Sequence, residues 1–79
     1  MITKETIEKI NSLLHYGDKK KLAKQTGLHV LTINSFFNGK EDTIIEATQN
    51  KIAEATFKLI EKRRKEAYEI EKKTNSLLG

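Results

Sequence analysis

The chain has no cysteine and no proline among its 79 residues. Without cysteine, neither a disulfide framework nor a cysteine zinc site can supply the stability that so short a chain needs. The absence of proline and a charged fraction of 33% favour helices throughout. We therefore expect an all-α protein with one small helical core.

Long apolar runs and catalytic patterns are also missing from the sequence. No segment approaches membrane-spanning length and no signal peptide is visible, so we expect an intracellular, cytoplasmic protein. There is no glycine-rich phosphate loop, no cysteine nucleophile and no metal-spaced set of ligands. We expect neither an enzyme nor a cofactor. The net charge of +4 favours a polyanionic partner.

The segment from Lys19 to Lys40 predicts two short helices separated by a tight turn. Gly27 stands at the turn, where a left-handed backbone costs glycine little. Apolar residues spaced by three and four positions give the second helix an inward face of Ile33, Phe36 and Phe37. This order is typical of a helix-turn-helix, whose second helix lies in the major groove of DNA.

Residues 22–40, LAKQTGLHVLTINSFFNGK, resemble the DNA-reading segment of the lambda-repressor-like superfamily, which includes the lactose-repressor family. A later segment resembles the helix that packs behind the motif in lactose-repressor-type domains. The matching positions are Ala23, Gly27, Leu28, Thr32, Ile33, Phe37 and Asn38, followed by Thr48, Lys51, Ile52, Glu54, Ala55 and Leu59. The chain departs from the family at Asn34-Ser35, where a Ser-Arg pair is usual. No sugar-binding effector domain follows, so we expect no small-molecule effector.

The resemblance implies that the outward face of residues 29–38 meets base edges. An asparagine can pair with adenine through two hydrogen bonds, and exposed apolar side chains can contact thymine methyl groups or another protein. The residues expected at bases are His29, Val30, Leu31, Asn34 and Ser35, and capping of the turn is the alternative role for His29. The residues expected at phosphates are Lys19, Lys20, Thr32, Asn38 and Lys40, and a solvated lysine face is the alternative for the first two.

A first helix is expected before the motif. It should begin at an N-cap on Thr3 and run to about Tyr16. Gly17 should then end this helix, and Asp18 should cap the next one, which is expected at residues 19–25.

The last helix is expected to begin between residues 43 and 48 and to cover the motif. Its apolar stripe repeats every seven residues at Ile45, Ile52 and Leu59, and Ile60 is the last residue expected to pack on the domain. Residues 1–60 are therefore predicted to form a helix-turn-helix domain of three short helices followed by the start of a long one.

Residues 61–79 are predicted to form a charged helical extension that is longer than so small a domain can cover. An isolated polar helix is marginal in water. Either the extension pairs with its copy in a homodimer, burying Ala67, Ile70 and Leu77, or it frays as a charged tail. Lys62 to Lys65 form a basic cluster, which we interpret as a solvated helix face rather than a contact to DNA.

These features favour a sequence-specific DNA-binding protein, a small bacterial or phage transcriptional regulator that reads the major groove with residues 29–38 as a homodimer. The expected partners are double-stranded DNA and a second copy of the chain, with no membrane. The alternative hypothesis is a helix-turn-helix scaffold for protein–protein interaction or assembly, with Val30 and Leu31 as an apolar patch. Nonspecific binding of nucleic acid through the lysines is a third hypothesis.

Overall fold

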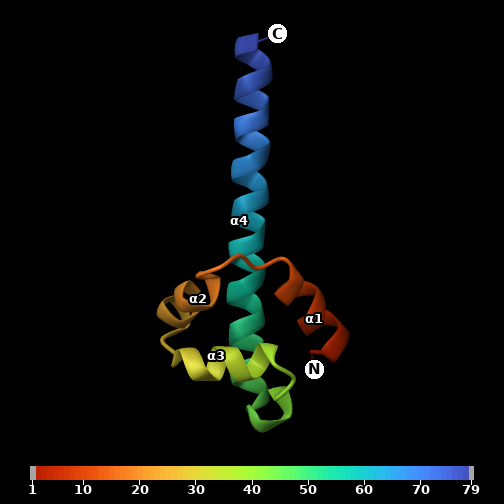
Figure 1. The fold of residues 1–79 in the computed structure, drawn as a ribbon, viewed down its shortest axis with the longest axis vertical. Helices are drawn as coiled ribbons and strands as arrows, with labels where there is room; N and C mark the ends of the chain where they lie inside the picture. The colour runs from red at the N-terminus through yellow and green to blue at the C-terminus, as the bar shows by residue number, and fades with distance from the viewer. Residues whose placement is uncertain (1, 79) are drawn as a thin grey trace.

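The computed structural model describes residues 2–78 as an all-α chain whose last helix projects far beyond the other three (Figure 1). The helices are α1 (Lys4–Ser12), α2 (Asp18–Thr26), α3 (Val30–Phe37) and α4 (Glu46–Leu78), and a 3-10 turn, η1 (Glu41–Thr43), precedes α4. The predicted fold class, three short helices followed by a long C-terminal helix, is confirmed.

Helix α1 begins as the sequence predicts but ends early. The Thr3 hydroxyl accepts a hydrogen bond from the backbone N–H of Thr6 at 3.2 Å, which satisfies one of the free amides of the first turn. The predicted end near Tyr16 is wrong, because the helix stops at Ser12. Residues 13–17 are needed as the connection that crosses in front of α4 to reach α2 (Figure 1).

The core lies where α1, α2 and α3 meet one face of α4. Nine apolar residues from all four helices are buried there, and two adjacent rings from α3 pack edge to face with centroids 4.9 Å apart. The buried residues are Ile7, Ile10, Leu22, Ile33, Phe36, Phe37, Ile52, Ala53 and Ile60. This burial fixes α3 on the rest of the domain. Leu28, at the turn, is only partly buried against this core.

The apolar stripe of α4 starts later than the sequence predicts. Ile45 is 72% exposed, because it precedes the first turn of the helix, so its predicted place in the stripe is wrong. Ile44 instead packs partly against the core. Thr56 is also buried, and its hydroxyl donates to the carbonyl oxygen of Ile52 at 2.7 Å, so this polar group is satisfied within the helix.

One side chain fixes the entry into α4. The amide nitrogen of Gln49 donates to the carbonyl oxygens of Glu41 and Ile44, each at 2.7 Å. These carbonyls belong to the turn that links α3 to α4, so the two hydrogen bonds hold the exit of the predicted motif against the long helix.

Candidate nucleic-acid interface

The turn between α2 and α3 is built around Thr26 and Gly27. Gly27 has the left-handed backbone that the sequence predicts, with a φ of 73°, and its N–H donates to the carbonyl oxygen of Ala23. The buried Thr26 hydroxyl donates to the carbonyl oxygen of Leu22 at 2.7 Å and accepts from the N–H of Leu28 at 3.3 Å. These bonds satisfy the end of α2 and set the direction in which the chain enters α3.

His29 is the N-cap of α3. Its Nδ1 accepts a hydrogen bond from the backbone N–H of Leu31 at 3.1 Å, and the side chain is exposed. The structure therefore favours the capping role that the sequence left open beside base contact. Capping through Nδ1 also fixes the imidazole at the start of the helix, next to the face that is expected to meet DNA.

Fewer side chains of α3 are exposed on its outward face than the sequence predicts. Leu31 is 66% exposed and is the most prominent side chain, whereas Asn34 and Ser35 are half-buried. Val30 is also half-buried and so does not form an exposed apolar patch with Leu31. An apolar docking surface on α3 would consist mainly of one leucine, which weakens the protein-scaffold hypothesis.

A hollow of about 550 Å³ brings predicted base-reading and phosphate residues together. Val30 and Asn34 line it from α3, and Lys19 and Lys20 line it from the first turn of α2. Lys20 is exposed, whereas the ammonium of Lys19 lies 5.5 Å from the centroid of the Phe37 ring. This cation–π contact holds one positive charge beside α3.

A second hollow flanks α3 on its other side. Leu31, Thr32 and Ser35 line it together with Thr43 and Thr48. Thr32 therefore lies on the opposite edge of α3 from the two lysines. Hydroxyl groups at such an edge suit hydrogen bonds to phosphate oxygens.

The remaining predicted phosphate residues lie at the end of α3. Asn38 is the C-cap, is exposed, and donates its N–H to the carbonyl oxygen of Asn34 at 2.9 Å. Lys40 is exposed, and its N–H donates to the carbonyl oxygen of Ser35 at 3.0 Å. The ten predicted contact residues thus lie on α3, at its two ends and at the start of α2.

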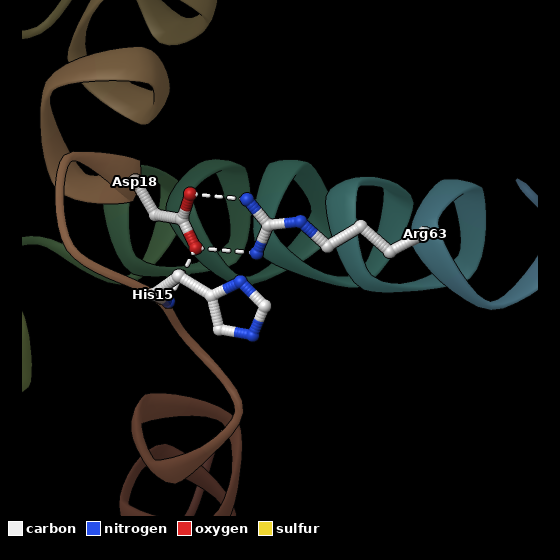
Figure 2. Close-up of polar contacts among 3 residues, drawn as sticks. All are labelled: His15, Asp18 and Arg63. Atoms are coloured by element: carbon white, nitrogen blue, oxygen red, sulfur yellow. Dashed lines mark hydrogen bonds and ion pairs between the residues drawn. The ribbon is translucent and has the colours of Figure 1, made fainter. Parts of the chain in front are cut away.

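One buried ion pair of the domain was not predicted. The Arg63 guanidinium donates two hydrogen bonds to the Asp18 carboxylate (Figure 2). The same carboxylate also accepts a hydrogen bond from the backbone N–H of His15 at 2.5 Å. The Asp18 side chain is 1% exposed and the Arg63 side chain 27%. The two bonds from Arg63 lower the pKa of the Asp18 carboxyl from 3.8 to about 2, although burial acts in the opposite direction.

This pair overturns two predictions. Asp18 is the first residue of α2 rather than its cap, and the N-cap position belongs to Gly17, whose φ is 87°. Arg63 is partly buried, so the basic cluster at residues 62–65 is not wholly a solvated face. One signal was present in the sequence, because Arg63 falls three residues after Ile60, on the apolar stripe of α4. A charge on such a stripe indicates a buried partner.

Beyond Arg63, α4 leaves the domain and remains helical to Leu78 (Figure 1). Its apolar side chains are exposed, including Ile70 at 65% and Leu77 at 85%, and Ala67 is exposed as well. The predicted dimerisation residues therefore have no cover from their own chain within the described part.

Comparison of the chain with protein-family models, curated proteins and solved structures finds no match. Among residues 2–78, no helix is long and apolar enough to cross a membrane. The same residues contain no group of three or more histidine, aspartate or glutamate side chains placed to hold a metal ion.

Proposed function

We propose that this protein is a sequence-specific DNA-binding regulator that places α3 in the major groove and acts as a homodimer. The observation that carries the proposal is the α2–turn–α3 unit. Its left-handed Gly27 and buried Thr26 present the polar edge of α3 outward, next to Lys19 and Lys20. Major-groove readers have this order of helix, turn and second helix.

The two kinds of contact have separate roles in this proposal. Lys19, Lys20 and Lys40 neutralise phosphates and supply affinity without choosing a sequence. Asn34 is the side chain best suited to read a base, because its amide offers a donor and an acceptor on the outward side of α3. Leu31 supplies an apolar contact of the kind that suits a thymine methyl group.

Selection of bound duplexes from a random pool, at physiological salt, tests the proposal directly. We expect enrichment of a palindromic site. Failure to enrich any sequence, with binding that vanishes steeply as salt rises, would leave only nonspecific attraction and would contradict the proposal.

Substitutions then assign the contacts on the selected site. Asn34→Ala should weaken binding to that site by about 1–3 kcal/mol and relax the preference at one base pair. Lys20→Ala should weaken binding to all sequences alike and reduce the salt slope by about 1. Lys72→Ala is the matched control, because this exposed lysine lies far along α4 and should leave binding unchanged. An Asn34→Ala variant that binds like the native protein would remove Asn34 from the reading surface.

A further inference from the structure

The apolar side chains of the extension lie on the continuation of the buried face of the domain, with Arg63 and Thr74 at the positions between them. At about 100° per residue, Ala67, Ile70 and Leu77 fall within the same third of the α4 circumference as the buried residues Ile52 and Ile60. They also follow a heptad spacing, with positions 60, 67 and 74 alternating with positions 63, 70 and 77. The face that binds the domain early in α4 is therefore bare later in the same helix.

We propose that a second copy of the chain covers this face, with the two extensions paired antiparallel. The oligomeric state is part of the proposed function, but the direction of pairing rests on the geometry and charges of α4 and does not depend on DNA binding.

The position of the domain argues against parallel pairing. Helices α1 to α3 cover the early part of this stripe, where Ile52 and Ile60 are buried. The connection at residues 13–17 crosses α4 (Figure 1), and the Asp18 carboxylate joins its His15 N–H to the Arg63 guanidinium. In a parallel pair, both domains would have to occupy the same space between the two helices. An antiparallel pair places them at opposite ends.

The apolar layers suit an antiparallel pair whose two-fold axis passes between Tyr68 and Glu69. Ala67 then faces the partner's Ile70, so a small side chain opposes a large one in both central layers. Leu77 lies at the level of the partner's Ile60, which is already buried under its own domain, so Leu77 meets the edge of that domain rather than the stripe. Phe57, which is 44% exposed, flanks the stripe at the level of the partner's Leu78, which is 84% exposed. Each chain gains cover in this way on five exposed apolar side chains, Phe57, Ala67, Ile70, Leu77 and Leu78.

The charges beside the stripe distinguish the two directions. In the antiparallel pair, Glu66 lies beside the partner's Lys73, and Arg64 lies beside the partner's Glu71, so each flank carries opposite charges. In a parallel pair, Glu66 would instead lie beside the partner's Glu71, and the like charges would occur twice by symmetry. Charge complementarity therefore favours the antiparallel direction.

Reversing one charge tests the direction of pairing. Glu66→Lys places two lysines beside each other in the antiparallel dimer, and we expect its dissociation constant to rise about five- to twentyfold at low salt. In a parallel dimer, the same change would replace a repulsion by an attraction and tighten the complex. The double variant Glu66→Lys, Lys73→Glu should restore the native affinity.

Glu69→Lys is the matched control, because position 69 lies opposite the stripe and the change in net charge is the same. It should leave the dissociation constant unchanged. These constants are measured by sedimentation equilibrium without DNA, so failure of the dimer and failure of DNA binding are separate results. A native chain that stays monomeric at high micromolar concentration, or a tighter Glu66→Lys dimer, would overturn the proposal.

A distance measurement gives an independent test. The chain lacks cysteine, so Asn50→Cys creates a single site for a spin label on the exposed side of α4. Position 50 lies about 18 residues from the two-fold axis, so antiparallel pairing predicts two labels about 55 Å apart at a rise of about 1.5 Å per residue. Helix axes in contact lie about 8–10 Å apart, so parallel pairing predicts less than about 30 Å. A distance in that shorter range would contradict the antiparallel arrangement.

The arrangement also constrains the DNA site if α3 reads DNA as proposed above. Helix α3 lies near the start of α4, because Thr32 and Thr48 line the same hollow. Equivalent positions near Ile52 lie about 50 Å apart in the antiparallel dimer. One helical turn of DNA spans about 34–36 Å. The selected half-sites should therefore be centred more than one turn apart. Half-sites one turn apart would overturn the antiparallel pairing and leave DNA binding intact.

Discussion

The ion pair between Asp18 and Arg63 gives the sharpest prediction about stability. Arg63→Met keeps a long, flexible side chain and removes the guanidinium, which leaves the Asp18 carboxylate 1% exposed and without its charged partner. Removing one member of a buried pair costs about 3–5 kcal/mol, and the partial exposure of Arg63 places this case at about 2–4 kcal/mol. Since small domains are stable by about 5–15 kcal/mol, much of the free energy of unfolding would be lost.

The same ion pair should also make the free energy of unfolding depend on pH. A carboxyl whose pKa falls from 3.8 in the unfolded chain to about 2 in the folded one stabilises the native state by ~2 kcal/mol at neutral pH. This stability is present above about pH 4 and is lost as the pH falls through the range from 4 to 2. In Arg63→Met the lowering disappears and burial raises the Asp18 pKa, so this loss should vanish or change sign.

Urea unfolding followed by far-ultraviolet circular dichroism, at neutral pH and at about pH 3, measures both effects. Asp18→Asn is the companion variant, because its amide oxygen can still accept from the His15 N–H, and we expect a loss of about 1–2 kcal/mol. The double variant Arg63→Met, Asp18→Asn should lose less free energy of unfolding than the two single variants lose together. Repeating each urea titration at a tenfold lower protein concentration separates effects on folding from effects on the proposed dimer. A loss below about 0.5 kcal/mol in Arg63→Met would refute the assignment of a buried, stabilising pair.

Two further substitutions test the packing. Gly27→Ala should cost about 1 kcal/mol of stability and lower the urea midpoint. The added methyl group meets no atom within 4 Å, so the cost comes from the left-handed backbone alone. An unchanged midpoint would mean that the turn relaxes. Ile52→Val should cost about 1 kcal/mol through the small cavity left beside the fully buried Ile52 side chain, and a neutral result would show that the α4 interface repacks freely.

Local signals in the sequence predicted most of the fold. The Thr3 cap, the left-handed Gly27 and the inward face of Ile33, Phe36 and Phe37 all depend on neighbours within one or two helical turns, and the structure contains each of them. The end of α1 was not predictable in this way. Residues after Ser12 have helix-forming side chains, but the chain must leave the helix there to cross α4, which is a constraint of tertiary structure.

The candidate site also combines features that near neighbours in the sequence predict with features that only the tertiary structure sets. The sequence indicated which face of α3 points outward, but not that Val30 is half-buried beside Lys19 and Lys20. It also gave no direct sign that Asp18 pairs with a residue 45 positions away. A charge on an apolar stripe can be noticed in a sequence, but its partner is set by how two helices cross. The proposed contacts to DNA and to a second copy remain predictions.

The junction at Arg63 divides α4 into two parts that should open independently. Backbone amides up to this residue pack against the domain, so they should exchange with deuterated water only when the whole domain unfolds. Amides beyond it need only local unwinding, unless another chain covers them. Exchange rates along this one helix should therefore change abruptly near residue 63 rather than drift toward its end. The difference in exchange rate between the two parts should shrink as protein concentration rises. Exchange along this one continuous helix would then report both the folding of the domain and its association with a second copy.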